Sequence, residues 1–333
     1  MSCRQAGPAP GTPPFRPPSQ ILMHVISASR RTDIPAFYTP WFLNRVRAGY
    51  CLAVNPFSRQ VDRVSLAADE VIAILFWTRN PAPLMPHLNE LDAYGLRYAF
   101  TITITGYGRD LDAAGPEPGA VVETFRRLAD RIGPECLQWR YDPIVLTPQL
   151  DADAHRRRFA RLCAQLSGST RRCAISFLQL YRKNRARLDQ AAQQGGFAYG
   201  YLPVGSVPPP RHGQVLALET MRALADDLGA IAAAHGIRVE SCCNPLLVHP
   251  LANVHPAHCV DPAVIRHLRP DLSLDLAPRP TRPGCGCYAS RDIGAYDTCA
   301  HACAYCYATR DPQSARAYLH RHDPTAAALG PGC

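Results

Sequence analysis

Val71-Ile-Ala-Ile-Leu-Phe-Trp77 is a short apolar run that is followed directly by the polar residues Thr78, Arg79 and Asn80. Runs of this kind recur along the chain and alternate with longer amphipathic segments. This alternation is typical of a parallel sheet on which helices pack. The expected strands are 22–27, 51–54, 71–77, 98–103, 137–140, 173–178 and 237–241, and the expected helices are 40–48, 83–94, 118–132, 151–166, 184–194, 214–235 and 262–268.

Strands that alternate with helices predict an α/β fold, either a TIM-barrel-like closed sheet or a doubly wound open one. Both architectures bind ligands at the carboxyl ends of the strands, so the residues after each strand are the candidate site. Arginine recurs at these positions, and a ring of guanidinium groups would hold carboxylates or phosphates. The arginines concerned are Arg30, Arg79, Arg140 and Arg182, and other polar residues at these strand ends include Arg31, Asp33 and Asp142.

The chain of 333 residues, 47% of them hydrophobic, can bury one large core. Residues 1–20 are rich in proline and poor in large apolar residues, which predicts a disordered tail, and Met23 is a candidate start. We expect a single α/β barrel-like domain over residues 21–310 that includes a cluster-binding segment at 285–307. A C-terminal helix and tail over residues 311–333 would follow, and the helix is expected to begin near Tyr307.

Fourteen cysteines occur without an apolar leader segment, which predicts reduced thiols in a cytoplasmic protein. No apolar run approaches the length that crosses a membrane, so no membrane partner is expected. The formal net charge is +9. Ten Arg or Lys residues and no Asp or Glu lie between His155 and Arg187, which suits either a solvated helix face or a nucleic acid or other anionic partner.

The segment Cys299-Ala-His-Ala-Cys303-Ala-Tyr305-Cys306-Tyr307 holds three closely spaced thiols near the C-terminus. A short loop with this spacing can turn the thiols toward one [4Fe-4S] cluster, with each sulfur on a different iron. The fourth iron then lacks a protein ligand, and an open metal position is typical of a centre that does chemistry. The alternative is a closed zinc site completed by His301 or by another cysteine.

A second set of cysteines flanks this segment and consists of Cys242, Cys259, Cys285 and Cys287, with Cys243 as a competitor for Cys242. These thiols could bind an auxiliary [4Fe-4S] cluster or a structural zinc ion. Alternatively, some of them are ordinary small buried residues.

Several motifs resemble the bacterial family catalogued as domain of unknown function 1848, over about Val25 to Tyr307. They are Ser27-Ala-Ser-Arg-Arg-Thr-Asp-Ile-Pro-Ala-Phe-Tyr38, Asn55-Pro-Phe57, Phe76-Trp-Thr-Arg-Asn-Pro81, Arg140-Tyr-Asp-Pro143 and Cys285-x-Cys287-x2-Ser290-x-Asp292-Ile293-Gly294-x-Tyr296-x2-Cys299. The Arg140-x-Asp142-Pro143 element is also similar to one in spore photoproduct lyase, a DNA-repair enzyme.

The cysteine triplet resembles the cluster motif of the radical S-adenosylmethionine (SAM) superfamily. This resemblance implies that the free iron chelates SAM and that an electron from the cluster cleaves it to a 5'-deoxyadenosyl radical. It further implies that Cys299, Cys303 and Cys306 bind the cluster. Tyr305 would then lie near the adenine, Arg140 and Asp142 would contact SAM, and Arg30, Arg31, Asp33 and Arg79 would face the substrate.

The position of the triplet departs from the superfamily, which carries it after the first strand of the barrel. A circular permutation would account for its place near the C-terminus, since chain termini often lie close together at a surface. The usual Gly-Gly-Glu stretch for the SAM amino group is absent.

The sequence therefore predicts a partial, circularly permuted barrel and a radical SAM-like enzyme that acts on an unknown, anionic substrate with an unidentified electron donor. The alternative is a non-catalytic, metal-stabilised protein that binds nucleic acid.

Overall fold

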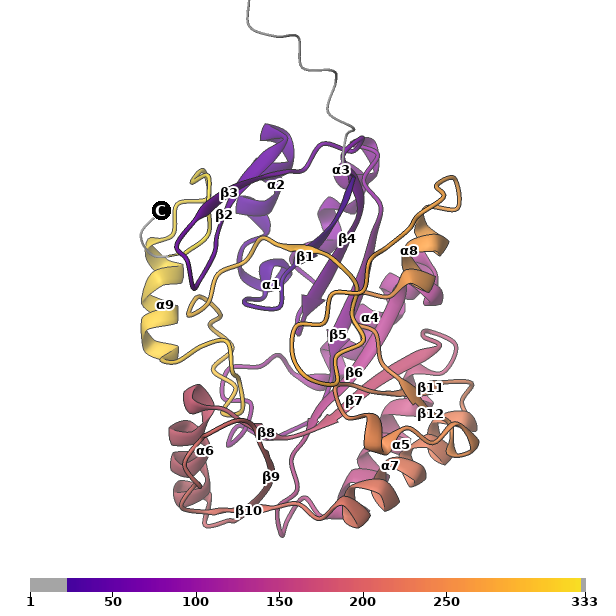
Figure 1. The fold of residues 1–333 in the computed structure, drawn as a ribbon, viewed down its shortest axis with the longest axis vertical. Coiled ribbons are helices and arrows are strands. Elements are labelled where there is room, and N and C mark those ends of the chain that lie inside the picture. The colour runs from indigo at the N-terminus through magenta and orange to yellow at the C-terminus, as the bar shows by residue number, and fades with distance from the viewer. Residues whose placement is uncertain (1–22, 331–333) are drawn as a thin grey trace, which may run out of the picture.

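A sheet of eight parallel strands forms the centre of the computed structural model, which describes residues 23–330 (Figure 1). The strand order is β12-β11-β7-β6-β5-β4-β1-β13. The bounds are β1 (His24–Ala28), β4 (Val71–Thr78), β5 (Tyr98–Thr103), β6 (Leu137–Ile144), β7 (Arg172–Phe177), β11 (Arg238–Ser241), β12 (Val254–Pro256) and β13 (Arg291–Asp292). The predicted α/β class is confirmed, whereas the tail predicted at 1–20 lies outside the described residues.

Helices connect most of these strands, as the amphipathic segments predicted. They are α1 (Ile34–Phe37), α2 (Thr39–Ala48), α3 (Leu88–Ala93), α4 (Pro118–Ile132), α5 (Ala152–Leu166), α6 (Arg182–Gly195), α7 (Leu218–Ala233), α8 (Pro262–Leu268) and α9 (Pro312–Arg321), with short 3-10 turns η1 (Met85–His87), η2 (Pro134–Cys136), η3 (Pro245–Leu247) and η4 (Pro250–Ala252). Within residues 23–330, none of the helices has the length and apolarity that crossing a bilayer requires.

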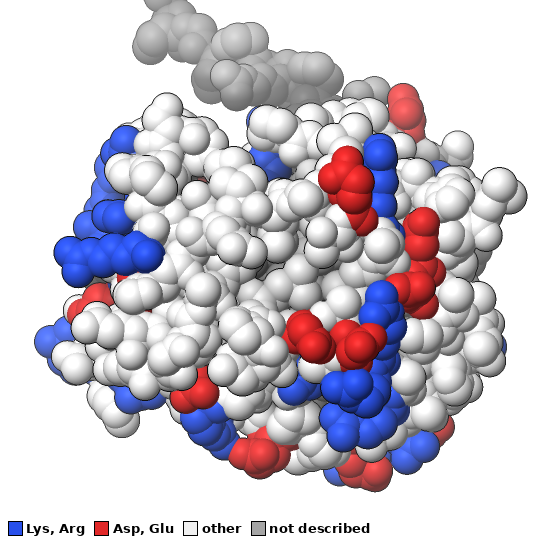
Figure 2. Space-filling model, turned by 90° about the horizontal axis from the view of Figure 1, so that it is seen from below, with Lys and Arg blue, Asp and Glu red and all other residues white. Residues whose placement is uncertain are grey.

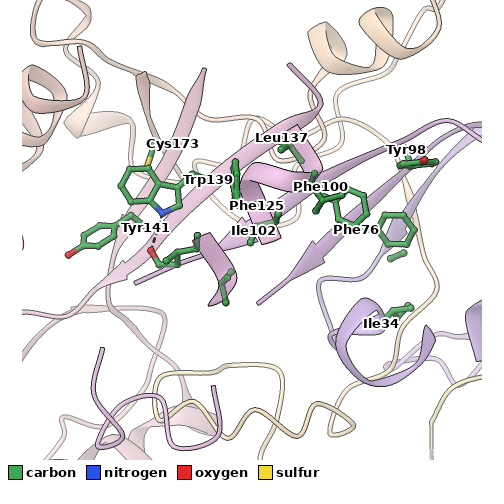
Figure 3. Packing of buried hydrophobic residues seen from close by; sticks show 14 of the residues in the cluster. Ile34, Phe76, Tyr98, Phe100, Ile102, Phe125, Leu137, Trp139, Tyr141 and Cys173 are labelled. Atoms are coloured by element: carbon green, nitrogen blue, oxygen red, sulfur yellow. Dashed lines mark hydrogen bonds between the residues drawn. The ribbon is translucent and has the colours of Figure 1, made fainter. Parts of the chain in front are cut away.

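The strands are buried because helices and loops cover the sheet, which is the usual setting of parallel strands. Every residue of β7 is buried, and so is β4 apart from Trp77. Aromatic side chains fill the space between the sheet and the helices (Figure 3). Phe76 stacks on Phe100 with ring centroids 4.8 Å apart, and Trp139 stacks on Phe159 of α5 at 4.7 Å. This packing fixes the strand ends relative to one another.

Two predicted segments fold differently from the expectation. Residues 51–54, predicted as a strand of the parallel sheet, belong to β2 (Tyr50–Val54), which pairs antiparallel with β3 (Val61–Ser65) in a separate hairpin. Residues 214–235, predicted as one helix, divide into β10 (Gly213–Val215) and α7. β10 pairs with β9 (Tyr199–Pro203), which pairs with β8 (Gln179–Leu180) in a small parallel sheet. Periodicity alone could not separate these short strands from the adjoining helix.

The eight-stranded sheet has β12 at one edge and β13 at the other. A pairing between these two strands, which would close a barrel, is not among the strand pairs of the described residues. The chain after α8 crosses in front of the sheet in Figure 1 and returns to β1, where β13 adds the edge strand. α9 follows at the left of that view, although the predicted helix began earlier, near Tyr307.

His155 of α5 gives the fold a pH dependence. The imidazole is buried between the Tyr141 hydroxyl, 2.7 Å from Nδ1, and the Val145 carbonyl, 3.0 Å from Nε2. Burial lowers the pKa of His155 from 6.5 to about 4. Between these values the unfolded chain binds a proton that the folded protein does not, so stability falls as the pH falls.

We therefore expect the free energy of unfolding to drop by up to about 3 kcal/mol from this group between pH 6.5 and pH 4. The variant His155→Gln should show a flatter pH dependence in that window in urea unfolding. His320→Gln, at an exposed position of α9, is the control. Parallel pH profiles for the wild type and His155→Gln would contradict this assignment.

Candidate metal centre

The cysteine-rich C-terminal segment is fastened to the first strand through β13. Ile26 and Ser27 of β1 align with Arg291 and Asp292 in parallel register. The Asp292 carboxylate accepts hydrogen bonds from the hydroxyls of Ser27 and Ser29, at 2.8 and 2.7 Å, and from the backbone N–H groups of Arg30 and Gly294, at 2.9 and 3.0 Å. A segment from the C-terminal part of the chain therefore meets the N-terminal strand at the carboxyl end of β1.

Gly294 is required at this junction. A Cβ atom at that position would lie 2.1 Å from the Ser29 hydroxyl oxygen, which no side chain can accommodate. The guanidinium groups of Arg30 and Arg31 lie 3.7 and 3.9 Å from the Asp292 carboxylate. These two predicted substrate residues thus surround the β1–β13 junction.

The loop that carries Cys299, Cys303 and Cys306 begins shortly after β13 and packs against residues 108–115. The Ala304 N–H donates to the Leu111 carbonyl at 2.8 Å, and the Ala114 N–H donates to the His301 carbonyl at 3.0 Å. From the other side, Arg187 of α6 donates to the carbonyls of Cys303 and Cys306. These contacts hold the backbone of the loop on both sides.

Asp33 connects the cysteine loop to β1 and β4. One carboxylate oxygen accepts from the Ala36 N–H at 3.0 Å, and the other accepts from the Arg79 N–H at 2.7 Å and lies 2.8 Å from His301 Nε2. The sequence offered His301 as an alternative zinc ligand. In the structure, its Nε2 atom instead faces the buried carboxylate of Asp33. Its Nδ1 has no hydrogen-bond partner among the described residues.

Arg79, Asp112 and Tyr305 form a buried network beside the triplet. The Arg79 guanidinium donates to the Tyr305 hydroxyl and to the Asp112 carboxylate, and the Tyr305 hydroxyl donates to Asp112. Arg79 and Asp112 also line a cavity of about 320 Å³, together with residues 103–109 and 115–118. Pockets of this size bind small molecules. The network therefore connects the cysteine loop to the lining of this cavity.

The thiols of the triplet influence one another electrostatically. Burial raises the pKa of Cys299 well above its usual value, and negative charge on Cys306 and Asp33 raises it further. Burial also raises the pKa of Cys303, although the nearby Arg79 guanidinium opposes this effect. Without a metal, the thiols of Cys299 and Cys303 are neutral at physiological pH, so binding a metal there would release protons.

The donor set of the triplet fits a thiophilic metal centre. Its donors are sulfurs, which favour zinc or iron–sulfur chemistry over hard cations. No group of three or more His, Cys, Asp or Glu side chains in residues 23–330 is arranged to hold a single metal ion. The ligands of an iron–sulfur cluster bind different irons and need not converge on one point.

Arg140 and Asp142, predicted to contact SAM, form a buried ion pair near the second set of cysteines. Arg140 donates to the sulfurs of Cys259 and Cys242, at 3.2 and 3.6 Å. The predicted residues therefore fall into three groups. Tyr305, Arg79 and Asp33 lie around the triplet of Cys299, Cys303 and Cys306, whereas Arg30 and Arg31 lie at the β1–β13 junction. Arg140 and Asp142 lie with the second set of cysteines, which consists of Cys242, Cys259, Cys285 and Cys287.

Four of the ten basic residues between 155 and 187 form ion pairs with carboxylates, namely Arg156, Arg171, Arg172 and Lys183. Arg156 pairs with Asp153 and Asp227, and Arg172 pairs with Glu240 and Asp261. On the face shown in Figure 2, basic and acidic side chains lie next to one another along the lower margin. Ion pairing therefore reduces the attraction of this segment for phosphates only in part.

Sequence reasoning missed residues that act through the backbone of the cysteine loop. Asn184 donates to the Tyr305 carbonyl at 3.0 Å. Arg187, which donates to the carbonyls of Cys303 and Cys306, stood out in the sequence only as one member of a basic run. Asp112 carried no signal, because it lies in a loop far from any motif. Asp292 and Gly294 could have been found, because they belong to the motif that precedes Cys299.

The fold and the site define a parallel α/β protein with a cysteine-rich segment at the carboxyl ends of its strands. A family model described as Domain of unknown function (DUF1848) matches residues 25–308. The chain therefore belongs to this family, which confirms the resemblance. A search of curated proteins gives no match.

We predict that Asp292→Ala lowers the free energy of unfolding by about 2–4 kcal/mol, because it leaves several buried donors without an acceptor. Urea unfolding followed by circular dichroism would measure the change. Asp62→Ala, at an exposed position of β3, is the matched control. Equal unfolding midpoints for the two variants would show that Asp292 does not anchor the segment.

Proposed function

We propose that this protein is a radical SAM-type iron–sulfur enzyme whose cluster is held by Cys299, Cys303 and Cys306. The observation that supports the proposal most strongly is the place of the cysteine loop in the sheet. Radical SAM barrels carry the triplet in the loop after their first strand. Here the loop follows β13, which pairs in parallel with β1.

In this proposal, the spatial order β13-β1-β4-β5-β6-β7 would correspond to a barrel in which the C-terminal part of the chain supplies the first strand. α9, after the cysteine loop, would correspond to the first helix. A circular permutation accounts for this arrangement, and the sheet is then a partial barrel. The short distance between the junction residues of β1 and β13 supports the same view.

When bound and reduced, the cluster would supply the electron that cleaves SAM to methionine and a 5'-deoxyadenosyl radical. The chain itself would provide three thiolates and fix their backbone through Arg187 and Asn184. His301 and Asp33 would keep the loop close to the strand ends. The protein would thus orient the cofactor, whose own chemistry performs the difficult step.

The cavity beside Arg79 and Asp112 is the proposed place for SAM or the substrate. Arg79 Nε is buried without an acceptor among the described residues, so this donor is available to an anionic group such as a carboxylate. Tyr305 contacts both cavity residues through its hydroxyl, which supports its proposed place near the adenine. Arg140 and Asp142 stay proposed SAM contacts.

The test is anaerobic reconstitution with iron and sulfide, followed by reduction and addition of SAM. We expect 5'-deoxyadenosine to form, and we expect Cys299→Ala, Cys303→Ala and Cys306→Ala each to reduce it to the level seen without protein. Cys163→Ala, which removes a thiol buried in α5 away from the triplet, should retain the activity.

Circular dichroism separates loss of the cluster from loss of the fold. A catalytic cluster predicts that Cys303→Ala stays folded and inactive. A zinc staple predicts unfolding instead, because binding a structural metal contributes folding energy. The proposal fails if reconstituted wild type forms no 5'-deoxyadenosine while it carries a reducible cluster.

A further inference from the structure

Five cysteines from separate segments of the chain form a continuous row of thiols, outside the triplet. The Sγ atom of Cys242 lies 3.7 Å from that of Cys243 and 3.9 Å from that of Cys259. The Cys259 N–H donates to the Cys287 sulfur at 3.2 Å, and the Cys287 N–H donates to the Cys285 sulfur at 3.4 Å. We call these five residues the thiol row.

The packing of the thiol row differs from that of the core cysteines. Cys51, Cys163 and Cys173 are fully buried among apolar side chains of the main core. In the thiol row, Cys243, Cys259 and Cys285 are only partly buried, and all five thiols are free. Ordinary core cysteines behave as small hydrophobic residues and have no reason to gather in one place.

Two guanidinium groups donate to the sulfurs of the row. Arg140 reaches Cys259 and Cys242, and Arg282 donates to Cys243 at 2.9 Å and to Cys242 at 3.8 Å. A neutral thiol is a weak acceptor, whereas a thiolate or a metal-bound sulfur carries the charge that a guanidinium complements. Hydrogen bonds of this kind to sulfur also tune iron–sulfur clusters.

Arg282 lacks a conventional counter-charge. Its remaining contacts are with the neutral groups of Gln179 and Tyr181, at 3.0 and 2.6 Å, and it forms no ion pair with a carboxylate among residues 23–330. A partly buried cation without an anion is costly. An anionic metal–thiolate group on the row would supply the missing negative charge.

The loop that supplies Cys285 and Cys287 packs closely against the segments that carry Cys243 and Cys259. A Cβ atom at Gly286 would lie 2.7 Å from the His258 imidazole, so only glycine allows the loop to meet the segment that carries Cys259. Gly284 has a φ of +73° and packs against the Cys243 carbonyl. The Cys-Gly-Cys sequence thus brings both thiols to the strand ends of β11 and β12.

We propose that the thiol row is a second iron–sulfur site, with Cys242, Cys259, Cys285 and Cys287 as ligands and Arg140 and Arg282 as donors to its sulfurs. Two sulfurs that bind the same tetrahedral metal ion lie about 3.8 Å apart. The Cys242 and Cys259 sulfurs, 3.9 Å apart, therefore suit one iron, and Cys285 and Cys287 supply a second pair of sulfurs. A cluster of two irons bridged by sulfide uses four cysteines in this way.

The proposed site is distinct from the triplet but faces the same end of the sheet. Tyr307 directly follows Cys306, and its ring lies 5.6 Å from that of Tyr181, which accepts from Arg282. These two tyrosines lie between the triplet and the thiol row. The proposal of a second site therefore does not depend on whether a cluster at the triplet cleaves SAM.

The decisive experiment uses a full-length variant in which Cys299, Cys303 and Cys306 are all changed to Ala. After anaerobic reconstitution, the proposal predicts about two irons and two sulfides per chain, with the visible absorption and Mössbauer signature of an iron–sulfur cluster. A colourless protein, or one that binds zinc without sulfide, would overturn it. Loss of SAM cleavage in the wild type would leave this outcome unaffected, so failures of the two proposals are distinguishable.

A second comparison keeps the result interpretable if a cysteine variant is unstable. In the same triple-alanine background, Cys259→Ser should lose most of the bound iron, whereas Cys136→Ser, outside both thiol groups, should retain it. Arg282→Met keeps every thiol, and we expect it to lower the midpoint potential of the remaining cluster because it removes a positive charge near the sulfurs. Unchanged iron content in Cys259→Ser, or an unchanged potential in Arg282→Met, would each contradict the assigned role.

Discussion

The parallel pairing of β13 with β1 is the contact on which the rest of the site depends. It joins residues at opposite ends of the sequence, and the Asp292 carboxylate secures it with hydrogen bonds from both strands. Because the cysteine loop follows β13 closely, this pairing places the triplet at the carboxyl ends of the strands. The cavity beside Arg79 and Asp112 then lies next to it.

Arginines at the strand ends contact different groups, although the sequence shows them as one ring. Arg79 contacts the triplet side, through Tyr305 and Asp112. Arg140 contacts the thiol row, and its charge is partly offset by Asp142. Arg30 and Arg31 surround Asp292 at the β1–β13 junction. The arginine-rich end of the sheet therefore divides into distinct sites whose counter-charges are carboxylates or sulfurs.

The central strands were predictable because each is a continuous apolar run between polar ends, as in residues 71–77. The edge strands β12 and β13 were not, because their short sequences carry no apolar pattern. Residues 51–54 looked like a sheet strand, but their partner β3 is mostly exposed and polar. Only tertiary pairing distinguishes such a hairpin from a central strand.

The cysteines of the candidate site could be predicted from the sequence, whereas most of the residues that contact them could not. The spacing of Cys299, Cys303 and Cys306 identified one thiol group directly, and Cys242, Cys259, Cys285 and Cys287 were singled out as a second set. Their contacts with Arg282 could not be foreseen, since that arginine lies in a proline-rich loop. Asp112 and Asn184 reach the cysteine loop only through the fold, so no local sequence signal marks them.

The most direct measurement for the central claim is electron–nuclear double resonance of the reduced protein with SAM labelled with ¹⁵N at its amino group. If the triplet leaves one iron open, the spectrum should show hyperfine coupling between the cluster and the labelled nitrogen. A reduced cluster whose spectrum lacks that coupling under saturating SAM would contradict the account.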